Sequence, residues 1–293
     1  MRLIVSADDF GVSEQVNAAV ARAAREGVLT SASLMVTGEA ASQAVALAKD
    51  APRLAVGLHL TLSDGSSVLP YRAISQVVNA ESRFADSPVR AAIRYYFDRR
   101  AWPQLVREIW AQFEAFAQTG LRLSHVDGHQ HLHAHPAVFP TVVEMARRYG
   151  AVGIRTPRDP LWMNLRVDRS GLGAKAIVAL GHAYLAGVCR RLLPGSGLAT
   201  CDAVVGSLMS GRMTPRYVFA MLDRLNCRGV EMFFHPSETD SGQRCGPGTG
   251  DLRTLLDPAL KAYIDKRGCE MTTYAGIGNR EQGTGNRSEG GCA

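Results

Sequence analysis

The chain has 293 residues, of which 46% are hydrophobic and 20% are charged, with a formal net charge of +6. This is the composition of an ordinary folded protein. The charge is too small to indicate a nucleic-acid partner, and no Lys/Arg-rich run or nucleic-acid-binding motif accompanies it. The start, M-R-L-I-V-S-A-D-D-F, has only five apolar or small residues before two carboxylates, so we expect no signal peptide. The six cysteines contain no C-x-x-C pair, which favours reduced thiols and a cytoplasmic protein. A location at the inner face of the membrane is compatible with this expectation.

Taken in order, the predicted elements alternate between strands and helices. The compact apolar run Leu3–Ala7 predicts the first strand, and apolar residues at helical spacing over 13–26 predict a helix that ends at Gly27. Further strands are predicted at 31–36, 54–60, 122–126, 151–155, 202–206, 229–234 and 269–274. Further helices are predicted at 40–49, 89–100, 103–119, 137–149, 173–192, 214–226 and 251–267, and residues 61–85 are predicted to form a long loop.

Strands that are separated by helices imply parallel pairing and right-handed crossovers. The pattern predicts an α/β fold: a (β/α) barrel, distorted, with about seven parallel strands. A doubly wound open sheet is the alternative. We expect residues 1–275 to form a single domain with a helical insert around residues 158–216. Residues 276–293 contain six glycines and almost nothing apolar, which predicts a disordered tail.

Five of the eight histidines fall within residues 124–136, S-H-V-D-G-H-Q-H-L-H-A-H-P. They are His125, His129, His131, His133 and His135. Neutral imidazole is the commonest metal ligand and moves protons near pH 7. The cluster, with Asp127 inside it, therefore indicates a metal site; a polar loop whose histidines are merely solvated is the alternative. Five histidines cannot all bind one ion, so other segments must deliver ligands to the same place.

Polar residues also occur at the ends of other predicted strands. Asp8 and Asp9 end the first strand, His59 ends the third, and Arg155 and His235 end two later ones. Active sites of (β/α) barrels lie at the C-terminal ends of the strands. We therefore expect these side chains to meet the histidine cluster at one end of the barrel.

The adjacent carboxylates Asp8 and Asp9 have a specific use. Neighbouring side chains on a strand diverge, so the two can face one site only if the chain bends there. One can then bind a metal while the other acts as a base toward water. The alternative is that A-D-D-F-G is a turn in which an Asp caps the following helix.

These motifs carry a family resemblance. A-D-D-F-G at 7–11, G-L-H-L at 57–60, H-V-D-G-H-Q-H-L-H at 125–133 and M-F-F-H-P at 232–236 resemble the YdjC-type carbohydrate deacetylases, which include chitooligosaccharide deacetylases. The resemblance runs from residue 1 to roughly residue 275, with the four motifs in order. It implies a (β/α) barrel that uses a divalent cation to remove an acetyl group from an N-acetylated sugar.

Carried onto this chain, the resemblance implies that Asp9, His59 and His129 bind the metal. It implies Asp8 as the catalytic base and His235 as the acid. The remaining candidates, expected to support the ligands or to face the substrate, are His125, Asp127, His131, His133 and Arg155. Two histidines and a carboxylate suit Zn²⁺ or another transition metal chemically, whereas this family is often assigned Mg²⁺, and both assignments stay open.

Residues 174–193, A-K-A-I-V-A-L-G-H-A-Y-L-A-G-V-C-R-R-L-L, are an apolar helix with a narrow polar stripe of Lys175, His182 and Arg190. The helix is too short and too interrupted by charge to predict a membrane span. We expect it to face the barrel core. The alternative is an interfacial helix with basic flanks that docks on a membrane or on a lipid-bearing substrate.

The insert around residues 158–216 includes this helix, the lead-in Asn164–Arg169 and the segment C-D-A-V-V-G-S at 201–207. With these segments the chain resembles the hopanoid biosynthesis-associated branch of the same family. That resemblance implies an N-acetylglucosaminyl group on a bacteriohopanetetrol lipid as substrate, with a soluble chitooligosaccharide as the alternative. Two other classes stay open, a metal-dependent phosphoesterase and a non-catalytic glycolipid-binding barrel. A homodimer and a peripheral membrane contact are also compatible with the sequence.

Overall fold

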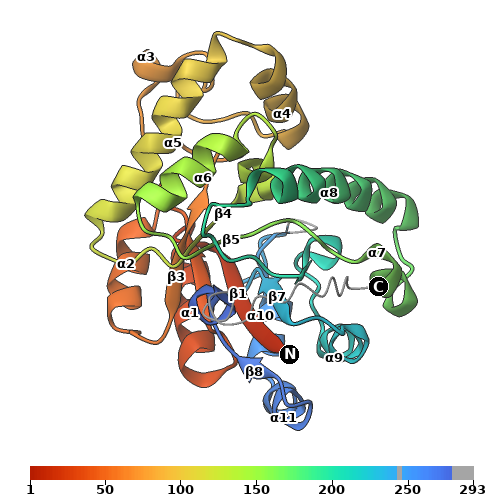
Figure 1. The fold of residues 1–293 in the computed structure, drawn as a ribbon. Coiled ribbons are helices and arrows are strands. Elements are labelled where there is room, and N and C mark those ends of the chain that lie inside the picture. Colours follow the sequence, from red (N-terminus) through yellow and green to blue (C-terminus); the bar gives the residue numbers. More distant parts are fainter. Residues whose placement is uncertain (243–245, 279–293) are drawn as a thin grey trace.

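A curled sheet of parallel strands lies at the centre of the molecule (Figure 1). The structure is a computed structural model that describes residues 1–242 and 246–278. The sheet order is β5-β4-β3-β2-β1-β7-β6, and the short strand β8 also pairs with β1. The strands are β1 (Arg2–Phe10), β2 (Ser31–Leu34), β3 (Ala55–Leu60), β4 (His125–Gly128), β5 (Gly153–Ile154), β6 (Ala203–Val205), β7 (Gly229–Phe234) and β8 (Glu270–Met271).

The two edges of this sheet are linked by the chain that leads into β6. Gly153 of β5 pairs in parallel with Ala199, and the amide of Val204 in β6 donates to the carbonyl of Arg158. The predicted distorted (β/α) barrel of about seven parallel strands is therefore confirmed. The doubly wound alternative is wrong, because an open sheet would leave these edges apart.

Helices cover the outside of the sheet, and Figure 1 shows most of them around its rim. They are α1 (Glu14–Glu26), α2 (Ala41–Lys49), α3 (Tyr71–Ile74), α4 (Pro88–Phe97), α5 (Ala101–Gln118), α6 (Phe139–Arg148), α7 (Leu161–Val167), α8 (Leu172–Leu192), α9 (Pro215–Arg224), α10 (Thr249–Leu256), α11 (Pro258–Lys266) and α12 (Tyr274–Gly278). Two short 3₁₀ segments, η1 (His129–Ala134) and η2 (Ser207–Met209), follow β4 and β6.

Several predicted boundaries differ from the structure. The predicted strand 122–126 is β4 at His125–Gly128, and the predicted loop 61–85 contains the short helix α3. The predicted helix 251–267 is two helices, because Pro258 begins α11 and the side chain of Asp257 caps it. The predicted strand 269–274 is only β8, followed by α12. The predicted tail begins at residue 276, but its first three residues belong to α12, and the rest lies outside the described residues. The expectation of reduced thiols is also wrong at Cys227, which is disulfide-bonded.

A bulge near the carboxyl end of β1 changes the direction of the side chains there. In the pairing with β2, Ala7 lies opposite Ala32 and Phe10 opposite Leu34, so two residues of β1 face one of β2. Asp9 is one of these two and has a left-handed backbone with φ of 60°. Bulges bend a strand and redirect its side chains. Here the bend brings both Asp8 and Asp9 to the same pocket, which a regular strand would not do.

Helix α8 does not lie in the core, so the expectation of a core-facing barrel helix is wrong. Only Lys175, Ala179, Ala186 and Cys189 are buried among its 21 residues. The composition could not distinguish the two cases, because an apolar helix has the same sequence pattern whether protein or another apolar phase covers it.

Candidate active site

A cavity of about 310 Å³ opens at the carboxyl ends of the strands. Six predicted site residues line it: Asp8, Asp9, His59, His129, His131 and His235. The other four predicted residues, His125, Asp127, His133 and Arg155, are buried. The structure thus brings the strand-end residues of β1, β3, β4 and β7 together.

Asp9, His59 and His129 form the group that could hold a metal ion. One oxygen of Asp9, Oδ1, lies 3.1 Å from Nδ1 of His129 and 3.4 Å from Nε2 of His59. The three side chains offer ligand atoms that all lie within 4.8 Å of one another. Donors that each lie about 2.1 Å from one tetrahedral ion are separated by roughly these distances. The donor set therefore fits a divalent cation and leaves coordination positions for water or substrate.

The orientation of His59 is fixed from behind. Its Nδ1 donates to Oδ1 of Asp127 at 2.8 Å, so Nε2 faces Asp9. Asp127 accepts a second hydrogen bond from the hydroxyl of Ser33 at 2.7 Å, and that hydroxyl lies 3.1 Å from Nε2 of His125. Carboxylates that hold metal-ligating histidines in this way fix the tautomer and ring direction.

Arg155 is the hub of the buried charges beneath the pocket. Its guanidinium donates to both carboxylate oxygens of Asp8, at 2.6 and 2.8 Å. It also bonds Glu231 at 2.8 and 3.1 Å and lies 2.9 Å from Asp127. Tyr274 donates to the same Glu231 at 2.7 Å. Asp8 is therefore compensated by a guanidinium, whereas Asp9 faces only histidines.

Burial and charge act in opposite directions on these groups. Burial favours neutral Asp9, but His129 and His59 outweigh it and hold the pKa of Asp9 well below its ordinary value. Burial also disfavours charged His59, but Asp127 and Asp9 raise its pKa to about 10. Burial dominates at His125 and His131, and it lowers the pKa of each. With its pKa raised to about 10, His59 carries a proton at neutral pH, so a cation that bound between His59 and Asp9 would displace that proton.

The histidine-rich segment after β4 is divided by its backbone. Gln130 and His131 have left-handed conformations in η1, with φ of 54° and 58°. His129 and His131 line the pocket, whereas His133 turns inward and donates through Nε2 to the carbonyl of Arg155 at 2.9 Å. His135 lies outside the pocket, where its ring packs against Tyr96. Non-glycine residues rarely adopt such backbone conformations, and they concentrate at functional sites.

His235 enters from the end of β7. Its Nδ1 lies 3.3 Å from the hydroxyl of Ser210, and its amide donates to Asp251 at 2.9 Å. Asp251 also accepts from the amide of Met213 at 2.9 Å, so one buried carboxylate joins the segments after β6 and β7. The imidazole is thus placed across the pocket from the β3–β4 side.

Several pocket residues were not predicted. Val178 and His182 of α8 line it, together with Asp64, Ser207 and Ser210. The ring of His182 lies edge-on to that of His131, with centroids 4.9 Å apart. His182 could have been predicted as a site residue, because it is a lone histidine in an apolar helix. Glu231 could have been predicted as well, because it is the single carboxylate in the apolar strand G-V-E-M-F-F.

Two further groups of donors exist near the first. Asp8, His59 and Asp127 form one, and His125, Asp127 and Glu231 form another. The carboxylates in both groups are already bonded by Arg155. Among the described residues, the Asp9 group is thus the one of the three whose carboxylate is free of a guanidinium.

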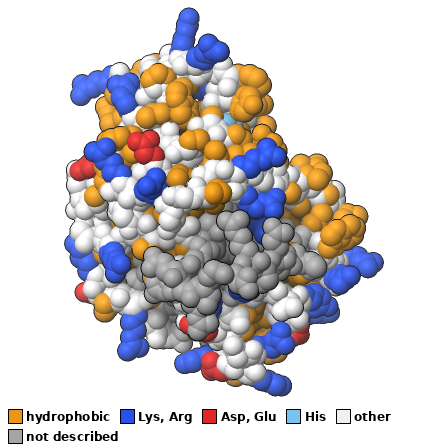
Figure 2. Space-filling view, in the orientation of Figure 1, with side chains coloured by type: hydrophobic (Ala, Val, Ile, Leu, Met, Phe, Trp, Pro, Cys, Tyr) orange, Lys and Arg blue, Asp and Glu red, His pale blue; other side chains and the backbone are white. Residues whose placement is uncertain are grey.

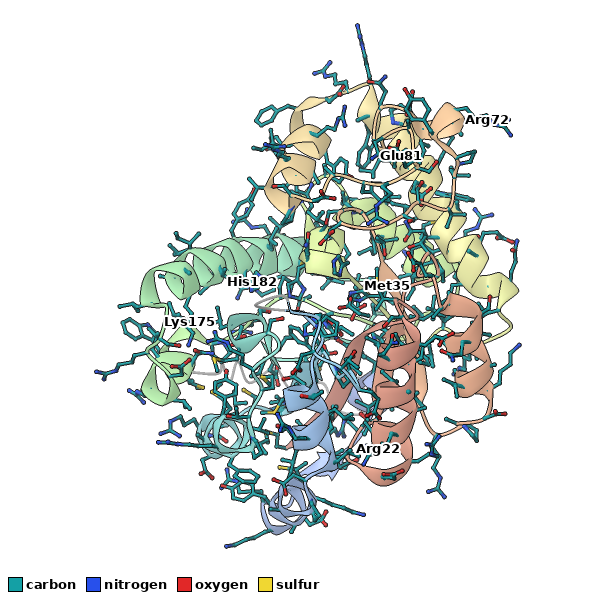
Figure 3. The ribbon with its side chains drawn as sticks, turned by 180° about the vertical axis from the view of Figure 1, so that it is seen from behind. Arg22, Met35, Arg72, Glu81, Lys175 and His182 are labelled. Carbon is teal, nitrogen blue, oxygen red and sulfur yellow. The ribbon has the colours of Figure 1, made fainter. Side chains whose placement is uncertain are left out.

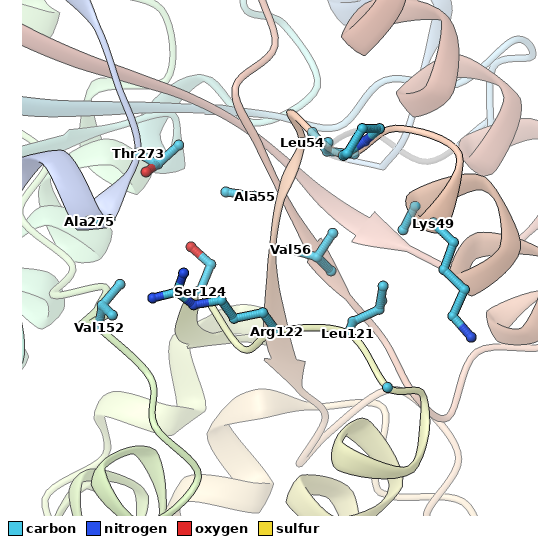
Figure 4. A pocket seen from close by; sticks show the side chains of 13 residues that line it. Lys49, Leu54, Ala55, Val56, Leu121, Arg122, Ser124, Val152, Thr273 and Ala275 are labelled. Carbon is cyan, nitrogen blue, oxygen red and sulfur yellow. The ribbon is translucent and has the colours of Figure 1, made fainter.

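A second pocket, of about 340 Å³, lies at the other end of the strands (Figure 4). Residues at the start of β3, including Ala55 and Val56, line it together with Lys49, Arg122 and Ser124. None of the predicted site residues contributes to it. The two pockets are similar in size, so the chemistry of the lining, and not its volume, identifies the candidate active site.

Comparisons with known proteins place the chain in a family. The model of the family described as YdjC-like protein matches residues 2–266. A carbohydrate deacetylase from Brevibacillus brevis is 32% identical, over 95% of this chain and 100% of the relative. A chitooligosaccharide deacetylase from Enterobacter sp. is 28% identical, over 93% of this chain and 97% of the relative.

The fold recurs in a solved structure from Enterococcus faecalis V583, named as a candidate cellobiose-phosphate cleavage protein. It has a TM-score of 0.72 at 21% identity and covers 94% of this chain and 98% of that one. The family model spans all of the strand-end residues that meet in the pocket, from Asp8 to His235. The chain therefore belongs to the YdjC-like protein family.

Proposed function

We propose that this protein is a metal-dependent hydrolase that removes the N-acetyl group from an N-acetylglucosaminyl sugar. One observation carries the proposal: Asp9, His59 and His129 gather beside the Arg155-held carboxylate of Asp8, with His235 lining the same pocket. Relatives named as carbohydrate deacetylases support the reaction type. An amide is a poor electrophile with a poor leaving group, and this set of residues meets both difficulties.

In this proposal Asp9, His59 and His129 hold the divalent ion. When bound, the ion would polarise the acetyl carbonyl and acidify a water molecule. Asp8 takes the proton of the water that adds to the carbonyl carbon. His235 gives a proton to the nitrogen as the carbon–nitrogen bond breaks, so acetate and a free amine leave. Each proton transfer by a positioned group contributes roughly 10²–10⁴-fold to the rate.

The Arg155–Asp8 pair is compatible with a basic role for Asp8. Both oxygens of Asp8 accept from the guanidinium, but each carboxylate oxygen has a second lone-pair direction. The two hydrogen bonds from Arg155 fix the direction of the carboxylate. At His235, the bond between Nδ1 and Ser210 leaves Nε2 as the nitrogen to protonate the leaving amine.

We further propose that the sugar is attached to a hydrophobic lipid, as the resemblance to the hopanoid-associated branch implies. Support comes from α8, whose residue Val178 lines the pocket while Ile177 and Leu180 beside it are more than 70% exposed. A soluble chitooligosaccharide would not need this apolar wall. Burial of apolar area contributes about 25 cal/mol per Å², so a lipid covering a few hundred Å² adds several kcal/mol of binding.

The test is the release of acetate by the metal-loaded protein, with soluble and lipid-linked N-acetylglucosaminyl substrates compared in the same detergent. We expect acetate from both and a higher kcat/KM for the lipid-linked one. Ile177→Asp should remove that preference and leave the soluble substrate unaffected. No acetate from either substrate would contradict the deacetylase proposal, and phosphate release from a sugar phosphate would favour a phosphoesterase. Equal or faster turnover of chitobiose would contradict only the lipid proposal.

A further inference from the structure

Two helices beside the candidate active site expose apolar stripes. On α8, Ile177, Leu180 and Tyr184 are 74%, 71% and 59% exposed, and their spacing places them on one face. On α4, the residues Val89, Ile93, Tyr96 and Phe97 are 65%, 55%, 58% and 74% exposed at the same kind of spacing. Isolated exposed apolar side chains are ordinary, but two such stripes are not. Figure 2 shows hydrophobic side chains gathered over this side of the molecule.

Both helices flank the same histidine-rich segment. Tyr96 of α4 packs against His135, and His182 of α8 packs against His131. The opposite face of α8 is directed into the protein. There His182 lines the pocket and Lys175 is buried in a 2.8 Å ion pair with Asp168, and Figure 3 shows both on the inner side of the helix. An object that covers the two stripes would therefore lie beside the mouth of the candidate active site.

The charge around the stripes is mainly positive. Asp86 and Asp98 flank α4 and Asp168 precedes α8, but Asp98 lies 3.9 Å from Arg94 and Asp168 is paired with Lys175. Neither α4 nor α8 contains an Asp or Glu. Exposed arginines accompany both helices: Arg90, Arg94, Arg99 and Arg100 near α4, and Arg166, Arg169, Arg190 and Arg191 at the two ends of α8. An apolar surface with basic flanks complements the interface of an anionic bilayer. A second copy fits less well, because a two-fold contact would bring the arginines at one end of α8 against those at the other.

A hollow at the junction of α7 and α8 has the same character. It has a volume of about 440 Å³ and is lined by Trp162, Leu165 and Leu172 together with Arg166 and Arg169. Trp162 is 78% exposed. Tryptophan favours the boundary between hydrocarbon and head groups, and guanidinium groups bind phosphate.

From these four observations we propose that α4, α7 and α8 form a docking surface for an anionic lipid bilayer. The surface lies in the interface and does not span the membrane. The prediction that this helix is too short and too charged for a span is wrong, because by length and composition alone α8 is long and apolar enough. Its inner face, however, is a wall of the pocket and holds the buried Lys175. Docking is independent of the reaction in the pocket.

The test is flotation of the full chain with vesicles of phosphatidylcholine alone and of phosphatidylcholine with phosphatidylglycerol, neither containing any glycolipid. We expect binding to the anionic vesicles that weakens as salt rises. Leu180→Asp or Phe97→Asp should weaken it about tenfold or more, because each removes apolar contact and introduces a repelled charge. Arg166→Gln with Arg169→Gln should remove the preference for anionic vesicles.

A matched pair of tyrosines supplies the control. Tyr184→Asp changes an exposed tyrosine within the surface, whereas Tyr71→Asp changes one that is 43% exposed on α3, outside it. Only the first should weaken binding. Failure of the wild-type protein to bind anionic vesicles, or equal weakening by both tyrosine variants, would overturn the proposal. So would a dimer that Leu180→Asp dissociates, with no recruitment to vesicles. Acetate release from a soluble substrate, measured on the same variants, reports on the deacetylase separately.

Discussion

Asp8 and Asp9 are neighbours in the chain, and their surroundings give them different chemistry. Asp8 is bonded on both oxygens by Arg155, which fixes its direction. Asp9 faces the nitrogens of His59 and His129 and has no guanidinium beside it. A cation can reach Asp9 together with two imidazole nitrogens, whereas the charge of Asp8 is already compensated by Arg155. These surroundings support the proposal that Asp9 is a metal ligand and Asp8 the base.

The ligand assignment predicts the metal content of histidine variants. His59→Ala and His129→Ala should each lose stoichiometric metal and activity while the fold is retained, because each removes one of three protein donors. The measurement is elemental analysis of the purified proteins together with circular dichroism. His135→Ala is the matched control, since His135 lies outside the pocket, and it should keep its metal. Full metal content in both ligand variants would mean that the ion lies elsewhere.

A second prediction separates the base from the ligands. Asp8→Asn should keep the metal and lose at least about 10²-fold in kcat, because the amide cannot accept the proton of the attacking water. Metal content and turnover, measured on the same preparation, decide the matter. Loss of metal in this variant would show that Asp8 is a ligand, as its proximity to His59 and Asp127 also permits.

The role of His235 predicts a dependence on the leaving group. An acetyl amide needs a protonated nitrogen to leave, whereas an acetyl ester of an acidic phenol does not. His235→Ala should therefore slow amide hydrolysis far more than ester hydrolysis, with the metal still bound. Equal losses on the two substrates would exclude His235 as the acid.

At the scale of the elements, the close packing of β3 on β4 supports the site. A Cβ added at Gly57 of β3 would lie 2.5 Å from the ring of His125, which stacks on Tyr274 at 4.9 Å. Gly57 therefore leaves the space in which the His125 ring lies beneath Ser33 and Asp127.

Two glycine substitutions test this packing. Gly57→Ala should destabilise the protein by about 1–3 kcal/mol, because the buried ring must move. Gly187→Ala on α8, where nothing beyond the helix's own neighbouring backbone lies within 4 Å of the added Cβ, should be neutral or stabilising by up to about 1 kcal/mol. Urea unfolding gives both values. A neutral Gly57→Ala would mean that His125 shifts without loss of packing.

The strand ends were predictable from sequence because the barrel architecture itself decides where they meet. Apolar runs locate the strands, and the residue after each run must lie at the same end of a parallel barrel. The sequence pattern did not single out His129 among the five clustered histidines, and that choice came from the family resemblance. Which histidine faces the pocket depends on the left-handed backbone at Gln130 and His131, and hydrophobic periodicity does not predict such a turn. The exposure of α8 was not predictable, because it is decided by which surface the helix meets and not by its own pattern.

For the whole molecule, buried histidines set the response to acid. Burial lowers the pKa of His133 and of His182 to about 4. Between pH 6.5 and 4 the unfolded chain binds protons at these positions and the folded protein does not, so stability falls as the pH falls. Burial raises the pKa of Asp159 to about 6, which has the opposite sign and offsets part of the loss. Each histidine contributes up to about 3 kcal/mol across this window.

The expected result is a free energy of unfolding that declines from pH 6.5 to pH 4. It is measured by urea unfolding of chelator-treated protein, so that metal release does not contribute. His133→Gln, which can still donate to the carbonyl of Arg155, should decline less steeply by about one proton. An unchanged slope would mean that His133 is protonated in the folded state.

The buried carboxylates around Arg155 also determine how charge is distributed between the interior of the barrel and the exposed surface. Within the barrel one guanidinium bonds three carboxylates, Asp8, Asp127 and Glu231, and the carboxylate of Asp9 lies in the pocket above them, although the chain as a whole has a net charge of +6. The buried site is therefore negatively charged, whereas the exposed surface is positively charged overall. Small cations are favoured at the buried site, whereas the surface attracts polyanions that are too large to enter it. Rising ionic strength should therefore weaken binding at the surface much more than binding at the buried site, since buried charges are screened least.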